Sequence, residues 1–329
     1  MHALKAKIKD AEKIRKELLT LGILAHGYKI KKDKTSLYFP LSSVPENYPT
    51  LELDFEKTNT EHSFKKTLQN SLPAEDLEKI KTAMDIVGSI AILEIDPTLH
   101  KHALLIAETL LKTNKTIKTV VRKQGEHSGI FRTQDYEYLA GEQTFETIHR
   151  ENKVQFFLDI RKTYFSPRLS TERLRISKLI KKGEKVLVLF SGIGAYPLVF
   201  SKNSPAKEIY GVELNPDACL YAEKNILLNK THNVFLYCGD AREVSSHLEK
   251  TFDRILLPLP HGAENFLPLL PSLSKKGTVI HLYSVSKEED FSSVRSKLIS
   301  FFPQAKVQTL IKCGMIKVRT FRICIDFTL

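Results

Sequence analysis

The sequence predicts an α/β protein in which a doubly wound, Rossmann-like domain follows two smaller α+β domains. Three observations support this: strand and helix patterns alternate from residue 164 onward, a glycine-bearing loop follows the first buried strand of that region, and the earlier segments mix both element types without such alternation. The expected domains are 1–58, 72–163 and 164–329. With 329 residues, 42% of them hydrophobic, the chain is long enough for several packed cores.

The first expected domain opens with an amphipathic segment. Over residues 4–21 the apolar side chains fall on one helical face and Gly22 follows as a stop signal, so the spacing predicts a helix. The apolar positions are Leu4, Ile8, Ala11, Ile14 and Leu18. Short β-like runs follow at 27–30, 36–41 and 51–55, with a polar run at 31–34 between the first two. The polar, lysine-bearing stretch 56–71 is expected to be a linker.

The second expected domain mixes strands and helices. Residues 86–95 (IVGSIAILEI) form an apolar β run, and residues 116–122 are rich in β-branched side chains. Helices are expected at 74–84 and 97–111, and further strands at 143–149 and 154–160. This mixture is typical of an α+β domain.

The third expected domain alternates regularly. Strands are predicted at 185–190, 208–214, 233–238, 254–257 and 277–283, and helices at 172–181, 196–201 and 216–229. Such alternation indicates parallel βαβ units. Ligands of these sheets bind beyond the carboxyl ends of the strands, where the strand order reverses.

The balance of charges favours a polyanionic partner. The formal net charge is +12 and the sequence pI is about 9.3, which points to nucleic acid first and an acidic membrane surface second. A lysine-rich protein with no such partner is the alternative that composition leaves open. No apolar run reaches the roughly 18 residues of a membrane span, and the N-terminus lacks the apolar core of a signal peptide.

The cysteines predict neither a zinc site nor a disulfide framework. Cys219, Cys238, Cys313 and Cys324 form no CxxC pair. We therefore expect a cytoplasmic protein with buried free thiols and no metal.

The loops that follow the predicted strands indicate which nucleotide the sheet binds. Phe190, Ser191 and Gly192 begin a GxG loop that lacks both the third glycine of a dinucleotide fingerprint and a phosphate-binding GK[ST]. Glu213 ends the second strand, Asp240 ends the third, and Pro258-Leu259-Pro260 follows the fourth. This order predicts an S-adenosylmethionine pocket, with Glu213 on the ribose hydroxyls and Asp240 near the adenine. Alone, Glu213 would read as a surface acid and Asp240 as a helix N-cap.

Several motifs together resemble one enzyme family. The run from Tyr164 to Arg175 (YFSPRLSTERLR) is similar to the signature of the archaeal and eukaryotic tRNA (guanine-37-N1)-methyltransferases, and their wyosine-pathway relatives share much of it. Further matches are Phe131-Arg132, 138–142 (YLAGE), 147–152 (TIHREN), 212–216 (VELNP) and 239–243 (GDARE). The resemblance covers nearly the whole chain. It implies a domain that recognises the tRNA elbow, a middle domain that grips the anticodon arm, and a class I methyltransferase domain, in a monomer.

The resemblance also assigns residues to roles. Methylation of guanine N1 needs a base for the N1 proton and a cation beside O6, and the family pattern implies Glu172 and Arg132 for these roles. The same pattern gives the cofactor Tyr164, Arg173, Phe190, Ser191, Gly192, Glu213, Leu214, Asn215, Asp240, Ala241, Pro258, Leu259 and Pro260, and gives the RNA substrate Arg132, Arg168, Arg175 and His261. Arg173 fits the methionine end of the cofactor or the tRNA. Ordinary ion pairs of Glu172 with Arg175 or Arg168 are the alternative.

Two positions depart from the family pattern and bear on the substrate. Val188 stands where many relatives have an acid, and Pro258 stands where most guanine-N1 enzymes have Asn. The second departure is similar to the archaeal "a" subclass, some members of which also methylate carbon-7 of 4-demethylwyosine. Transfer of the cofactor's aminocarboxypropyl group and tRNA binding without catalysis are the competing functions.

Overall fold

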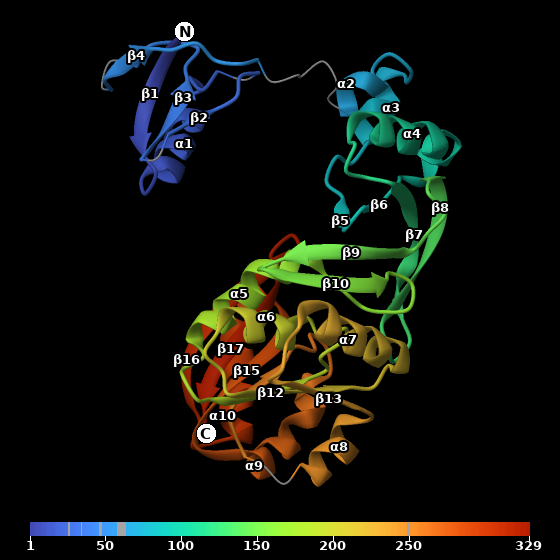
Figure 1. The fold of residues 1–329 in the computed structure, drawn as a ribbon, viewed down its shortest axis with the longest axis vertical. Helices are drawn as coiled ribbons and strands as arrows, with labels where there is room; N and C mark the ends of the chain where they lie inside the picture. The colour runs from blue at the N-terminus through green and yellow to red at the C-terminus, as the bar shows by residue number, and fades with distance from the viewer. Residues whose placement is uncertain (26, 34, 46–47, 58–63, 249–250) are drawn as a thin grey trace. The chain divides into compact units, whose positions relative to one another are not determined.

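A four-stranded antiparallel sheet with one helix forms the core of the first eighty residues (Figure 1). The computed structural model describes residues 1–25, 27–33, 35–45, 48–57, 64–248 and 251–329, and divides into two compact units, 1–80 and 81–329. In the first unit the strand order is β2-β3-β1-β4. The elements are β1 (His2–Lys7), α1 (Ala11–Thr20), β2 (Lys31–Lys32), β3 (Ser36–Pro40), β4 (Thr50–Glu52), α2 (Phe64–Leu68) and α3 (Ala74–Lys79).

The expected helix over 4–21 is wrong in its first part. Residues 2–7 are a central strand whose alternating small and apolar side chains, including Leu4 and Ala6, pack on α1 and β3. Strand β1 pairs with β3 over Ala3–Lys7 and with β4 over His2–Leu4, and these backbone hydrogen bonds outweigh its helical periodicity. Ile8, placed on the expected helical face, is exposed.

Two further expectations for this unit also fail. The strand expected at 27–30 forms instead at Lys31–Lys32, because the Asp33 carboxylate accepts the backbone N–H groups of Thr35 and Ser36 and so holds a tight turn directly after it. Within the expected linker 56–71, residues 58–63 lie outside the described residues and Phe64–Leu68 form α2.

The second unit begins with a four-stranded sheet in the order β5-β6-β7-β8 and a separate two-stranded ribbon, β9-β10. These strands are β5 (Asp85–Val87), β6 (Ile90–Leu93), β7 (Thr119–Ser128), β8 (Thr133–Gly141), β9 (Glu146–Glu151) and β10 (Val154–Asp159), and the helices are η2 (Pro97–His102) and α4 (Ala103–Thr113). The single run expected at 86–95 is a hairpin that turns at Gly88, where φ is +58°. Strand β8 had not been expected.

A seven-stranded sheet follows, in the order β13-β12-β11-β14-β15-β17-β16. Its strands are β11 (Lys185–Leu189), β12 (Glu208–Glu213), β13 (Val234–Cys238), β14 (Phe252–Leu257), β15 (Ser274–Lys287), β16 (Lys306–Lys317) and β17 (Thr320–Thr328). The first five are parallel, whereas β17 and β16 run antiparallel. The order reverses at β11, which is the expected position for a ligand in a doubly wound sheet.

Helices cover both faces of this sheet. On one face lie α5 (Ser170–Leu179), preceded by the turn η3 (Pro167–Leu169), α6 (Ala195–Asn203) and α7 (Pro216–Asn229). On the other lie α8 (Ala241–His247), α9 (Leu270–Leu273), preceded by η4 (Ala263–Leu269), and α10 (Phe291–Phe301), preceded by η5 (Glu288–Asp290). The Rossmann-like architecture expected from the sequence is therefore present.

The β9-β10 ribbon is held against the seven-stranded sheet by helix α7. The Asn225 side chain bonds the backbone N–H and C=O of Phe157, at 2.7 and 3.1 Å, and Asn229 does the same for Gln155, at 2.8 and 2.7 Å. One apolar core runs from β5–β7 through β10 to α5, α6 and α7. The structure thus joins residues 81–329 in one unit, while the three-domain division remains a prediction.

Candidate active site

A cavity of about 480 Å³ lies at the carboxyl ends of β11, β12, β13 and β14, where the sheet topology predicts a ligand. Most of the expected cofactor loops reach it. Its lining consists of Gly129, Ile130, Phe131, Arg132, Tyr164, Phe190, Gly192, Val212, Glu213, Leu214, Asn215, Ala218, Gly239, Asp240, Ala241, Arg242, Pro258, Leu259, Pro260, His261 and Phe266. The walls combine a few polar groups with many apolar ones, as is usual for a nucleoside site.

The loop after β11 brings the backbone close to the cavity. Phe190 and Gly192 both have positive φ, +59° and +57°, and the Gly192 N–H donates to Glu213 Oε2 at 2.7 Å. Phe190 packs edge-on against Phe266, with 4.7 Å between ring centroids. Ser191, in the same loop, is buried and is not among the residues that line the cavity. Its expected cofactor contact remains a prediction.

The two expected acids lie where the loop order predicted. Glu213 Oε1 accepts the backbone N–H of Asn215 at 2.8 Å, and burial raises the pKa of the Glu213 carboxyl although backbone donors oppose the shift. Asp240 Oδ1 accepts the Arg242 backbone N–H at 2.7 Å, so it caps α8 as well as lining the cavity. Asn215 caps α7 through its side-chain oxygen, which gives this lining residue a structural role too.

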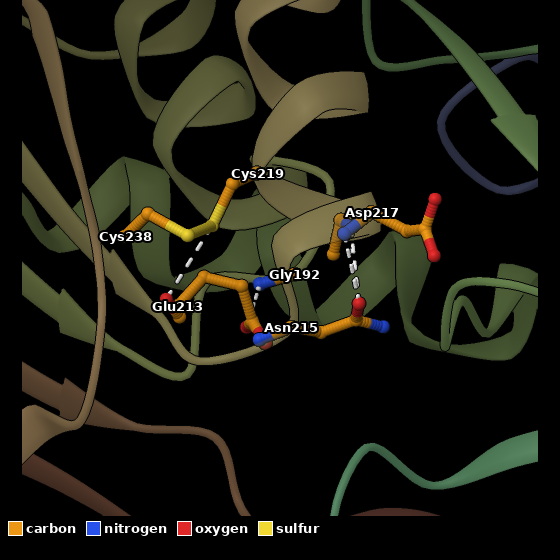
Figure 2. The surroundings of a disulfide bond; sticks show 7 residues. Gly192, Glu213, Asn215, Asp217, Cys219 and Cys238 are labelled. Atoms are coloured by element: carbon orange, nitrogen blue, oxygen red, sulfur yellow. Dashed lines mark hydrogen bonds between the residues drawn. A yellow bond between two sulfur atoms is a disulfide. The ribbon is translucent and has the colours of Figure 1, made fainter.

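A disulfide links two of the cavity loops, contrary to the expectation of four free thiols. Cys219 in the first turn of α7 is joined to Cys238 at the end of β13 (Figure 2). The Cys219 sulfur lies 3.4 Å from the Glu213 carbonyl oxygen, which also accepts the Gly239 N–H at 2.7 Å. The two cysteines are 19 positions apart in the sequence, and only the βαβ crossover brings them together. Cys313 and Cys324 are free, as expected.

Cationic side chains gather around Tyr164 at one end of the cavity. The turn between β7 and β8 carries Arg132, whose guanidinium lies 5.5 Å from the centroid of the Tyr164 ring. Arg322 on β17 donates from Nη2 to the Tyr164 hydroxyl at 3.1 Å. Burial lowers the pKa of His261, and the nearby charges of Arg132 and Arg322 lower it further. Sequence reasoning had not selected Arg322.

Besides Ser191, four charged residues with expected site roles do not line the cavity. Arg173 is buried and donates to both oxygens of Glu151, at 2.5 and 2.7 Å. Arg168 pairs with Asp85 at 2.6 Å. Glu172 and Arg175 form a bidentate pair, which is the ion-pair alternative weighed for Glu172. The roles expected for these four remain predictions.

Glu172 and Arg175 begin a buried chain of charged groups, which we call the buried network (Glu172, Arg175, Asp326, His281, Arg254 and Glu184). Arg175 bridges Glu172 and Asp326, the latter at 2.9 Å. His281 contacts Asp326 through Nδ1 at 2.6 Å and the Arg254 guanidinium through Nε2 at 2.7 Å, and Arg254 pairs with Glu184. A guanidinium only donates, so His281 is neutral with its hydrogen on Nδ1, and burial accordingly lowers its pKa.

His281 and Asp326 also lie close to Cys324, a combination that can bind metal elsewhere. Here Arg175 and Arg254 face those groups and occupy their polar atoms. Although burial alone would raise the pKa of Asp326, His281 and Arg175 hold it well below its usual range. The cluster is therefore part of the buried network.

Comparison with known proteins shows the family to which the chain belongs. The family model for the TRM5/TYW2 methyltransferase domain matches residues 147–309. The model for the TYW2 N-terminal domain matches residues 64–144, and the model for the tRNA methyltransferase 5 N-terminal domain matches residues 3–49. A relative from Pyrococcus abyssi, the tRNA (guanine(37)-N(1))-methyltransferase Trm5b, is 36% identical over 288 residues, covering 88% of this chain and 85% of the relative. The chain belongs to the TRM5/TYW2 family. The family resemblance drawn from the sequence is thus confirmed.

Two further members show the range of the TRM5/TYW2 family. The tRNA (guanine(37)-N(1))/4-demethylwyosine(37)-methyltransferase Taw22 of Nanoarchaeum equitans is 30% identical over 304 residues, covering 74% of this chain and 99% of Taw22. A solved complex of aTrm5 and tRNALeu superposes with a TM-score of 0.73, with 29% identity and complete coverage of both chains. No helix in the described parts of our chain is long and apolar enough to cross a membrane.

Proposed function

We propose that this protein transfers the methyl group of S-adenosylmethionine to N1 of guanosine 37 in tRNA. The observation that supports it most is the composition of the cavity. The loops expected to bind the cofactor and Arg132 line the same cavity. Membership of the TRM5/TYW2 family and the names of its members support the same reaction.

The residues present fit the cofactor. Glu213 and Asp240 line the cavity with carboxylates suited to ribose hydroxyls and to the adenine amine, and Val212, Leu214 and Phe266 supply apolar surface for the purine. S-adenosylmethionine supplies an electrophilic sulfonium methyl group. Because the transfer is an in-line displacement, the chain needs to position two reactants rather than to bind a metal.

Arg132 and Glu172 are our proposed catalytic residues. As the N1–methyl bond forms and the sulfur–methyl bond breaks, N1 loses its proton and negative charge develops on O6, which Arg132 is placed to stabilise from the cavity lining. Glu172 would take the N1 proton. Its carboxylate now accepts hydrogen bonds from Arg175 and Tyr283, so it must exchange one of these partners for the purine before it acts.

The loop after β14 supports a second substrate. Pro258 and Pro260 line the cavity, and neither offers the side-chain amide that most guanine-N1 enzymes carry at position 258. A wall without that amide accepts a bulkier purine, and relatives such as Taw22 are named for both guanosine and 4-demethylwyosine. We therefore include carbon-7 of 4-demethylwyosine as a candidate acceptor.

The RNA contacts complete the proposal. The net charge of +12 suits sequence-independent binding to phosphates. We place the tRNA elbow on the N-terminal domain and the anticodon arm on the middle domain, in a monomeric protein of the cytoplasm.

The test is incubation of the purified full-length protein with labelled S-adenosylmethionine and two tRNAs, one with unmodified guanosine 37 and one with 4-demethylwyosine. Nucleoside mass spectrometry should find 1-methylguanosine in the first, with S-adenosylhomocysteine as the small product. Methylthioadenosine as the small product would instead indicate aminocarboxypropyl transfer. RNA binding without either product would show a non-catalytic protein.

A further inference from the structure

The corner of the cavity around Tyr164 holds more positive charge than the proposed reaction uses. We define the Tyr164 corner as Arg132, Tyr164, His261 and Arg322. Arg132, Tyr164 and His261 line the cavity itself, whereas Arg322 reaches Tyr164 from β17 without lining it. The two guanidiniums therefore approach the same ring at different points, one near its face and one at its hydroxyl.

Polar hydrogens in this corner lack acceptors. The Nε atoms of both Arg132 and Arg322 are buried and have no hydrogen-bond partner among the described residues. The Tyr164 hydroxyl accepts from Arg322, so its own hydrogen is left to donate. Because buried donors are nearly always satisfied in folded proteins, a set of unsatisfied ones marks a place that a ligand completes.

Neither guanidinium of the corner is paired with an acid in the part of the chain that the structure describes, and Glu264 acts only on His261, where it opposes the lowering of the pKa. Within the described residues neither Arg132 nor Arg322 forms an ion pair, whereas Arg168, Arg173, Arg175 and Arg254 all do. The depressed pKa of His261 agrees with a site already crowded with positive charge. The missing partner is therefore an anion.

We propose that Arg322 and the Tyr164 hydroxyl bind a phosphodiester of the everted target nucleotide, while Arg132 faces its base. The inference rests on the proposed function for the identity of the RNA. A nucleotide carries its charge on the phosphate, one ribose away from the base, and the corner offers cations on two sides of one ring. A guanidinium suits a phosphate because it donates several hydrogen bonds in one plane.

This placement makes Arg322 a positioning residue. A phosphate contact fixes the register of the RNA and leaves the reacting atoms untouched. Its loss should weaken RNA binding and raise KM, with little change in kcat or in cofactor affinity.

The first experiment compares full-length wild type with Arg322→Gln, using fluorescence anisotropy with a tRNA transcript and single-turnover kinetics. We expect RNA affinity to fall about tenfold and the slope of log K against log salt to decrease by about one. Arg322→Lys keeps the charge and should recover part of the loss. Arg295→Gln, which removes one charge from the exposed face of α10, should change neither value.

The second experiment identifies the phosphate. Anticodon stem-loops with one uncharged methylphosphonate, placed 5′ or 3′ of the target guanosine, are titrated with both proteins. At one of the two linkages the methylphosphonate should lower the RNA affinity of wild type to that of Arg322→Gln. The same methylphosphonate should not lower the RNA affinity of Arg322→Gln further. Additive losses at both linkages would overturn the proposal.

Other outcomes separate the two proposals. Unchanged RNA affinity in Arg322→Gln, or a fall in kcat with affinity unchanged, means that Arg322 contacts no phosphate. RNA binding that depends on Arg322 in a protein that transfers no methyl group means that the phosphate site stands and the proposed reaction fails.

Discussion

The Tyr164 corner and the buried network use the same residue types in opposite ways. In the network each guanidinium faces carboxylates or histidine, and the groups run without a break from Glu172 to Glu184. In the corner two guanidiniums lie beside one tyrosine with buried donors unsatisfied. Burial alone therefore does not separate a structural charge from a functional one. The two regions differ in whether the hydrogen bonds of their charged groups are already satisfied within the protein.

Glu172 is the residue that tests this distinction most severely, since it lies in the network and is proposed as the base. Glu172→Gln should lower single-turnover methyl transfer about 10²- to 10⁴-fold, the usual contribution of general base catalysis, and leave cofactor affinity from calorimetry within about threefold. Tyr283→Phe is the matched control because it removes one hydrogen bond to Glu172 and keeps the carboxylate. An unchanged rate in Glu172→Gln would confine Glu172 to the network.

Arg254 tests the purely structural side of the comparison. Its side chain is 3% exposed and pairs with Glu184 while contacting His281. Arg254→Met strands those partners, so urea unfolding should show a loss of about 3 to 5 kcal/mol, with kcat of the folded enzyme retained. The exposed Arg295→Met should cost less than about 0.5 kcal/mol. A loss below about 1 kcal/mol for Arg254→Met would mean that the network is not a stabilising unit.

The Cys219–Cys238 disulfide covalently links helix α7 to the end of strand β13, next to residues that line the cavity. Reduction, or Cys219→Ser combined with Cys238→Ser, should lower stability by about 3 kcal/mol, as the chain-entropy model gives for a loop of this length. Cofactor affinity should also fall a few-fold, since Ala218 and Gly239 beside the two cysteines line the cavity. Cys313→Ser serves as the control. Identical melting and cofactor binding before and after reduction would contradict this role.

Glu213 should give the smallest effect. Burial raises its pKa above the ordinary 4.5, so the ionised carboxylate, which we propose accepts the ribose hydroxyls, is lost at a higher pH than usual. Calorimetric cofactor affinity should therefore fall as the pH drops from about pH 8 to about pH 5, and Glu213→Gln should be about tenfold weaker with a flat profile. An equally steep profile in Glu213→Gln would assign the titration to another group.

The sequence predicts the first strands of the seven-stranded sheet well, and predicts the last two strands of that sheet and strand β1 less well. Strands β11 and β12 and helix α7 match their expected ranges closely, because buried parallel strands are continuous apolar runs and α7 begins with an Asn-Pro cap. Strands β16 and β17 were not expected. Strand β16 is largely exposed and mixes lysines with apolar residues, so no simple period marks it. The helix expected to begin at residue 4 was wrong for β1, because pairing with β3 and β4, rather than the spacing of its apolar residues, decides its secondary structure.

The candidate site divides in a similar way. Loops that follow predicted strands could be placed in advance, and Glu213, Asp240 and Pro258 do line one cavity. Arg322 and the disulfide could not, because each depends on a contact between distant segments that only the fold creates. The sequence also could not show which charged residues of helix α5 form ion pairs inside the protein. In the structure Arg173 pairs with Glu151, and Glu172 pairs with Arg175.

The hairpin that carries Arg132 precedes the methyltransferase domain in the chain, since the family model for that domain begins at residue 147. A gene fusion that exchanged this domain alone between two relatives would pair one parent's guanidinium with the other parent's cavity. Residues 81–329, which form one compact unit, carry the complete cavity, so an exchange that keeps Arg132 with its own cavity must transfer this whole unit.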